Sequence, residues 1–129
     1  MQQAAIEEGD HLAWCKQRVF ELGSHTSYLN PLWYAGSFSI GFTAGLVGDA
    51  WSLGFLAETE QQVVNHLEKH MTQLAHQDHK SHEILKQMQE DEALHRDEAI
   101  KAGAHKLPLV IQKLMQLMSK FMVKTTYWI

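Results

Sequence analysis

Proline is scarce in this chain, and its scarcity constrains the fold more than any other feature. Only two prolines, Pro31 and Pro108, occur among 129 residues. Proline removes a helical hydrogen bond and ends or kinks an α-helix, so the long proline-free stretches favour long helices. Apolar residues recur in these stretches at spacings of three, four and seven, as they do along one face of a helix. We therefore expect an all-α protein.

The first two helices are separated by a loop. The pattern of the first covers about residues 2–22 and stops at Gly23, a residue that favours the left-handed conformation at helix ends. Residues 23–31 are expected to form the loop, and a glycine-rich helix follows it. Because the first helical pattern starts with no capping residue or loop before it, we also expect an upstream part of the domain.

Three more helices are expected downstream. Asp49 is expected to cap a helix that starts near Ala50, and Asp78 is expected to cap the next one, which stops at Gly103. Pro108 fits the first turn of the last helix, where its missing N–H is not needed.

Composition narrows the class of protein. A chain of 129 residues with 45% hydrophobic residues suits one globular domain, here expected over residues 1–129. The formal net charge of −4 at pH 7 argues against a nucleic-acid-binding protein, which normally carries a basic face. The sequence holds no glycine-rich phosphate loop, zinc-finger spacing, serine-nucleophile elbow or internal repeat. Electrons for any redox reaction must therefore come from another molecule.

The segment 32–57 is apolar and rich in glycine, with Asp49 as its only formal charge. Gly41 and Gly45 have the GxxxG spacing that permits close helix contact. Roughly 17 apolar residues precede Asp49, which is at the short limit for a membrane-spanning helix. Three interpretations stay open: a buried core helix, a helix that lies in the membrane interface or lines an apolar ligand tunnel, and a membrane span.

The last helix carries a broad apolar stripe. The stripe consists of Leu109, Ile111, Leu114, Met115, Met118, Phe121 and Met122. It is flanked by Lys113, Lys120 and Lys124 and closed by Tyr127 and Trp128. A methionine stripe usually packs in a core, whereas flanking lysines and terminal aromatic residues also suit the surface of an anionic membrane.

Two pairs of metal-ligand residue types stand far apart in the chain. Glu8 with His11, and Glu92 with His95, are each three residues apart, so each pair shares one helix face. Random placement of the glutamates and histidines would give roughly 0.7 such pairs, so two pairs on different helices are only mildly surprising. Each pair is either a solvated face or half of a metal site.

The helix between these two pairs carries Glu58 and Glu60. A carboxylate there either faces solvent or bridges the two Glu-x-x-His helices. A di-iron carboxylate bundle takes one glutamate from each of two helices and Glu-x-x-His from each of two others. Oxygen-rich ligands with two histidines suit iron or manganese better than zinc. The chain supplies three of the four parts, so we expect the fourth carboxylate on a helix before Met1.

Four stretches of the sequence together resemble the demethoxyubiquinone hydroxylase family in its bacterial form. They are EEGDHLAWC, GSFSIGFTAGLVGDAWSLGFLAETEQQV, EDEALHRDEA and TTYWI, and the resemblance covers essentially the whole chain. It implies a ferritin-like helical bundle of the di-iron carboxylate type, with about five helices here and the first family helix missing. It also implies a monooxygenase of ubiquinone biosynthesis that hydroxylates the ring of a polyprenylated demethoxyubiquinol.

The resemblance further implies the site residues and cofactors. The implied iron ligands are Glu8, His11, Glu60, Glu92 and His95. They would hold two iron ions (Fe2+), with O2 as co-substrate and no catalytic residue beyond the ligands. His66 matches a family histidine near the di-iron centre and is a candidate neighbour of the ligands.

A polyprenyl tail gives the apolar segment a role. The candidate tail contacts are Trp33, Phe38, Phe42, Gly45 and Leu46. We expect a peripheral protein on the cytoplasmic side of the bacterial inner membrane, with no nucleic-acid partner. A homo-oligomer and a lipid-binding accessory protein stay open.

Two other functions also stay open. One is another ferritin-like metal oxidase, such as a ferroxidase or a manganese catalase, although soluble inorganic substrates require no apolar helix. The other is a non-catalytic, membrane-associated helical module that binds quinone or lipid.

Overall fold

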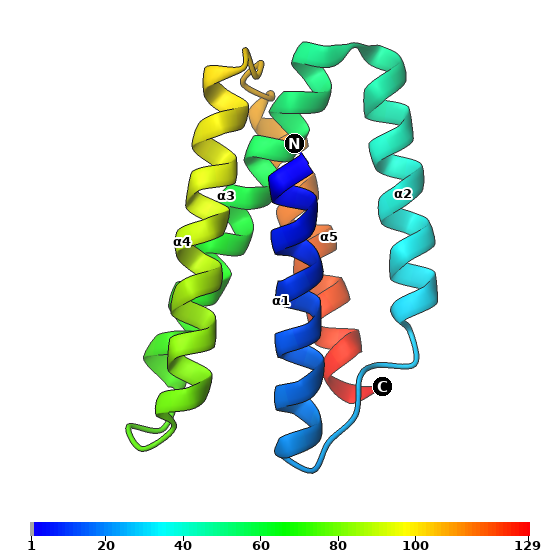
Figure 1. The fold of residues 1–129 in the computed structure, drawn as a ribbon. Coiled ribbons are helices and arrows are strands. Elements are labelled where there is room, and N and C mark those ends of the chain that lie inside the picture. The colour runs from blue at the N-terminus through cyan, green and yellow to red at the C-terminus, as the bar shows by residue number, and fades with distance from the viewer. Residues whose placement is uncertain (1) are drawn as a thin grey trace. The chain divides into compact units, whose positions relative to one another are not determined.

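The computed structural model describes residues 2–129 and contains five α-helices (Figure 1). They are α1 (Gln2–Glu21), α2 (Asn30–Val47), α3 (Asp49–Gln73), α4 (His79–Lys101) and α5 (Leu109–Trp128). No strand occurs in this described range, so the predicted all-α class is confirmed.

Glycines end two of the helices, as predicted. Gly23 and Gly103 adopt φ angles of 76° and 105°, which L-residues with a side chain rarely adopt. After Gly23, the amide of Ser24 donates a hydrogen bond of 3.0 Å to the carbonyl of Val19. This hydrogen bond satisfies a carbonyl that has no partner within the helix. After Gly103, the amide of Ala104 donates the equivalent bond to the carbonyl of Ala99.

The predicted helix starts are right to within two residues, but only one of the two predicted aspartate caps is found. Oδ1 of Asp78 accepts a hydrogen bond of 3.1 Å from the amide of Ser81, which caps α4. Asp49 is instead the first residue of α3, where its charge still favours the positive end of the helix. Pro108 precedes α5 rather than lying in its first turn. α2 starts at Asn30, two residues before the predicted segment.

The chain divides into two compact units. Unit 1 combines the stretch that ends at Thr26 with Glu60–His95, and unit 2 combines Ser27–Thr59 with Arg96–Ile129. Unit 1 therefore contains α1, the larger part of α3 and most of α4. Unit 2 contains α2, the first part of α3, the end of α4 and α5. A single domain over residues 1–129 stays a prediction.

The buried part of unit 1 is mainly polar. Among the described residues of unit 1, Leu67 is the one buried hydrophobic residue, whereas the buried polar residues are His11, Glu60, Ser81, Glu92 and His95. Near the C-terminal end of α1, Arg18 donates hydrogen bonds of 2.9 Å to Ser81 and to the capping residue Asp78. These bonds tie α1 to the start of α4. Buried carboxyl and imidazole groups destabilise a fold unless they are partnered, so this core depends on the partners of those groups.

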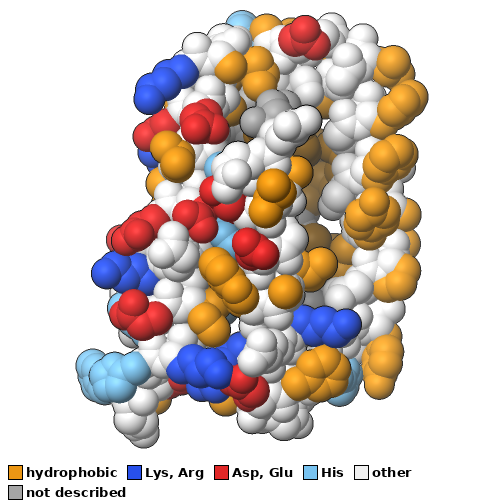
Figure 2. Space-filling view, in the orientation of Figure 1, with side chains coloured by type: hydrophobic (Ala, Val, Ile, Leu, Met, Phe, Trp, Pro, Cys, Tyr) orange, Lys and Arg blue, Asp and Glu red, His pale blue; other side chains and the backbone are white. Residues whose placement is uncertain are grey.

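The helices α2 and α5 of unit 2 bury no residue. The interpretation of α2 as a buried core helix is therefore wrong, because its apolar side chains face outward. Phe38, Phe42 and Leu46 are 66%, 61% and 73% exposed. Figure 2 shows hydrophobic side chains along α2 on the displayed face. In the stripe of α5, Met115 and Met122 are half-buried and the other members are exposed. Among residues 2–129, none of the helices has the combination of length and apolar character that a bilayer span requires.

A close backbone contact holds the start of α3 in unit 2. The amide of His105 donates a hydrogen bond of 2.8 Å to the carbonyl of Ala50. The His105 ring also lies against Trp51, with 4.9 Å between the ring centroids. A Cβ atom at Gly54 would collide with the carbonyl oxygen of His105. Glycine at this position is therefore what permits the loop after α4 to approach α3.

Candidate metal centre

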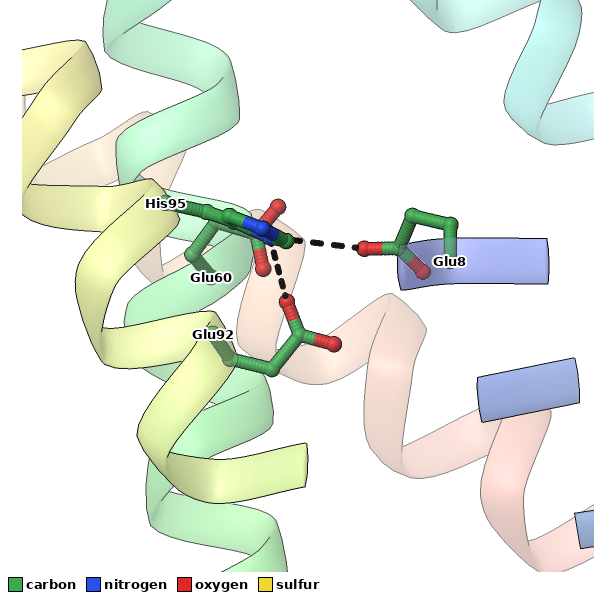
Figure 3. Close-up of side chains that lie close together, drawn as sticks. All are labelled: Glu8, Glu60, Glu92 and His95. Atoms are coloured by element: carbon green, nitrogen blue, oxygen red, sulfur yellow. Dashed lines mark ion pairs between the residues drawn. The ribbon is translucent and has the colours of Figure 1, made fainter. Parts of the chain in front are cut away.

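Four acidic and imidazole side chains from three helices of unit 1 converge on one point. Glu8 comes from α1, Glu60 from α3, and Glu92 and His95 from α4 (Figure 3). One ligand atom from each lies within 4.8 Å of every other. Three of the four residues are buried, whereas the Glu8 side chain is 52% exposed. The spacing of three places Glu92 and His95 on one face of α4, as the sequence predicts.

Glu92 lies between the two imidazoles. Its Oε1 is 3.3 Å from Nδ1 of His11, and its Oε2 is 3.4 Å from Nδ1 of His95. Nδ1 of His95 is also 3.7 Å from Oε1 of Glu8. Both Nδ1 atoms therefore face the carboxylates. Among the described residues, Nδ1 of His11 and Oε2 of Glu92 are buried without a hydrogen-bond partner.

The other nitrogen of each imidazole is held by a carboxylate from the opposite helix. Nε2 of His11 on α1 lies 2.9 Å from Oδ2 of Asp91 on α4. Nε2 of His95 on α4 lies 2.6 Å from Oε2 of Glu7 on α1. A proton on each Nε2 serves these hydrogen bonds and leaves the Nδ1 lone pair directed at the cluster. Histidines that bind metals are commonly oriented in this way.

A glutamine orients each of the two outer carboxylates, which are Glu7 and Asp91. Gln3 donates a hydrogen bond of 2.9 Å to Oε1 of Glu7, and Gln87 donates one of the same length to Oδ1 of Asp91. The nine-residue pattern Gln-x-x-x-Asp/Glu-Glu-x-x-His thus occurs twice, at residues 3–11 and 87–95. Sequence reasoning considered only Glu-x-x-His and missed this short repeat, although an acidic residue precedes both glutamates.

The cluster crowds three carboxyl groups into a largely buried space. Burial raises the pKa of Glu60 to about 9, helped by a hydrogen bond with Glu92 and by the charges of Glu92 and Glu8. The pKa of Glu8 is raised by its partial burial and by Glu92. Burial acts to lower the pKa of His95, but its hydrogen bond to Glu7 and the surrounding carboxylates outweigh this effect and raise it.

These features fit a bound cation. A nearby positive charge stabilises the ionised form of a carboxyl group whose pKa is raised, and so lowers that pKa. The unpaired Nδ1 of His11 and Oε2 of Glu92 are the kinds of atom that bind a metal, and both adjoin the cluster. Carboxylate oxygens with imidazole nitrogens suit iron or manganese. The residues present therefore fit the metal that the sequence resemblance implies.

The structure brings most of the predicted ligands together. Glu8, Glu60, Glu92 and His95 form the cluster, and His11 adjoins it through Glu92. His66 is not part of it: its side chain is exposed on α3, and its Nε2 lies 2.9 Å from Nε2 of His70. That these residues bind iron stays a prediction.

The predicted tail contacts all lie on α2 in unit 2. The rings of Phe38 and Phe42 stack with their centroids 6.4 Å apart, and Leu46 is exposed beyond them. Trp33 is half-buried against Phe121 of α5 in an edge-to-face contact of 6.5 Å. The space beside Gly45 is open. A tail channel along α2 stays a prediction.

Comparison with known families decides the assignment. The model of the family described as "Ubiquinone biosynthesis protein COQ7" matches residues 1–126. The chain belongs to this COQ7 family. Family membership together with the five helices confirms the predicted ferritin-like fold class. It also confirms the resemblance on which the ligand prediction rests.

Three relatives illustrate the similarity, and each is named 3-demethoxyubiquinol 3-hydroxylase. The one from Nitrosococcus oceani is 57% identical over 129 residues, which are 100% of this chain and 60% of the relative. The one from Polynucleobacter necessarius is 60% identical over 94% of this chain and 58% of the relative. The one from Acinetobacter baumannii is 55% identical over 100% of this chain and 61% of the relative.

The chain thus spans about three fifths of the length of these curated relatives. No solved structure matches it.

Proposed function

We propose that this chain bears the metal centre of a 3-demethoxyubiquinol 3-hydroxylase, a di-iron monooxygenase of ubiquinone biosynthesis. The observation that carries the proposal is the cluster of Glu8, Glu60, Glu92 and His95. It occurs in a chain that is 57% identical, over its whole length, to a relative of that name.

Five residues would hold the iron. Glu8, Glu60, Glu92 and His95 supply the converging ligand atoms, and His11 supplies the unpaired Nδ1 beside Glu92. Bound iron would supply the site at which O2 is activated, with electrons from a separate reductant. In the overall reaction, one oxygen atom enters a ring C–H bond and the other forms water, which consumes two electrons and two protons.

The residues of the chain prepare the site for the metal. Asp91 and Glu7 hold the imidazoles with each Nδ1 toward the cluster. Glu60 is protonated at neutral pH when no cation is present, because its pKa is about 9. It must release that proton to become a ligand, so iron uptake is coupled to proton release.

The outward apolar faces of unit 2 suit a substrate with a polyprenyl tail. Phe38, Phe42 and Leu46 on α2 would contact the tail or the acyl chains of the bilayer surface. On α5, the exposed Tyr127 and Trp128 suit the boundary between lipid and water. We place the protein peripherally on the cytoplasmic side of the bacterial inner membrane, where an oligomer or a lipid-binding accessory protein would present the quinol.

An isotope experiment tests the proposal. The iron-loaded protein is supplied with demethoxyubiquinol, a reductant and 18O2, and the product is examined by mass spectrometry. We expect one 18O atom in the new hydroxyl group, and no product from His95→Ala. Product that carries oxygen from water, or no product from protein with bound iron, would contradict the proposed activity.

A further inference from the structure

A second pair of nitrogen ligands lies on α3, apart from the cluster. His66 and His70 are four residues apart in the sequence NHLEKH and share one face of the helix. Both side chains are exposed. Neither belongs to the group that contains Glu60, although all three residues are on the same helix. The pair therefore has no role as a ligand in the buried cluster.

The two rings already have the geometry of a chelate. Their Nε2 atoms are 2.9 Å apart, with the ring centroids at 4.3 Å and the planes at 81°. Two metal–nitrogen bonds of about 2.05 Å place the nitrogens about 2.9 Å apart at a bond angle of 90°, and about 3.3 Å apart at the tetrahedral angle. The observed separation matches the right-angled geometry, which Cu2+ and Ni2+ prefer with nitrogen ligands.

We propose that His66 and His70 form a surface chelate for a late first-row divalent transition metal, with Cu2+ bound most tightly. Imidazole suits these ions, and Cu2+ heads the usual order of affinity. Among the described residues, the buried cluster is the one group of three or more ligand residues. The metal at His66 and His70 would therefore complete its coordination with water and exchange readily.

Local charge and protonation set the strength of this site. Without metal, the 2.9 Å contact requires one Nε2 to donate and the other to accept, so both rings cannot be fully protonated at once. Partial desolvation lowers the pKa of His66, although its side chain is exposed, and the charges of His70 and Lys69 lower it further. The neutral imidazole, which is the form that binds metals, is thereby favoured. Lys69 also opposes a bound cation, but water screens this exposed pair.

Copper titration of the whole chain tests the proposal. Cu2+ is added below one equivalent to the wild type and to His66→Ala, His70→Ala and His76→Ala, and binding is followed by electron paramagnetic resonance. We expect a tetragonal signal with two nitrogen ligands. Each of the first two substitutions should weaken binding by about 100-fold, because the second ligand on a rigid helix binds intramolecularly. His76→Ala removes another exposed histidine and should leave binding unchanged.

Three results would overturn the chelate. One is binding that survives either His66→Ala or His70→Ala. Another is equal loss with His76→Ala. A third is copper that is lost only in Glu92→Gln, which would place it in the buried cluster. Circular dichroism checks that each variant is folded. Because Cu2+ alone is the probe, failure here leaves the iron and hydroxylation experiments untouched.

Discussion

Asp91 holds His11 across two helices, with 2.9 Å between Oδ2 and Nε2. The contact is one half of a reciprocal arrangement, since Glu7 holds His95 in the same way at 2.6 Å. In both halves the carboxylate immediately before one motif's glutamate orients the histidine of the other motif. The two outer carboxylates thus couple the packing of α1 on α4 to the direction of the ligand atoms.

Asp91→Asn should weaken iron binding without unfolding the chain. An amide accepts a weaker hydrogen bond from the Nε2–H of His11 than a carboxylate does, so we expect about 10–100-fold lower affinity for Fe2+. Anaerobic titration measures this change. Glu90→Gln is the matched control, because Glu90 is exposed on the same helix one residue earlier. Equal affinity of Asp91→Asn and wild type would show that Asp91 has no orienting role.

Glu60 should make the metal-free protein less stable as pH rises. Its pKa is raised from 4.5 to about 9, so folding favours the protonated form. The stability that this preference contributes is fully present below about pH 4.5 and is lost as pH rises through about 9. Glu60→Gln keeps a neutral side chain at every pH. The difference in melting temperature between the variant and the wild type should therefore grow from pH 5 to pH 9, and a constant difference would argue against a raised pKa.

Gly54→Ala should destabilise unit 2, because the new Cβ meets the carbonyl of His105. We expect a loss of about 1–3 kcal/mol in the free energy of unfolding, typical of overpacking. Gly41→Ala is the control: it lies within α2 with open space around it, and alanine there should stabilise by about 0.5–1 kcal/mol. Thermal melting compares the two, and similar melting temperatures would contradict the close approach.

Replacing Phe38 and Phe42 together by serine should weaken binding to vesicles that contain anionic lipid. Both rings are exposed, so their loss removes apolar surface that would enter the bilayer and leaves the cluster of unit 1 intact. Iron content should stay at the wild-type value. Ile6→Ser controls for the loss of any exposed apolar residue, since Ile6 is 60% exposed on α1. Vesicle binding is measured by co-sedimentation. If both variants bind as tightly as the wild type, α2 does not contact the membrane through these rings.

The sequence predicts those parts of the site that depend only on spacing within a single helix. The spacing of Glu92 and His95 places both on one face wherever α4 lies, and Asp78 has the right residue type to cap it. The approach of Glu8 to these residues depends on how α1 packs, which no single helix determines; the family resemblance supplied that expectation. The outer pair, Glu7 and Asp91, was missed because its partners lie on opposite helices.

The exposure of α2 was beyond the reach of sequence reasoning for a physical reason. An apolar helix has the same composition whether protein, lipid or a ligand covers it. Phe38 and Phe42 therefore fitted a core helix and an interfacial helix equally well. The contact of Gly54 with His105 was missed for a related reason, since the sequence gives no sign of which glycine a distant loop approaches.

The central claim is that the cluster binds iron, and iron counted per chain tests it most directly. The wild type, Glu92→Gln and Glu90→Gln are loaded with Fe2+ without oxygen, freed of unbound metal and assayed for iron and protein. We expect iron in the wild type and in Glu90→Gln, and little in Glu92→Gln, because Glu92 lies between both imidazoles. Wild-type protein without iron, or Glu92→Gln with as much iron as the wild type, would contradict the account.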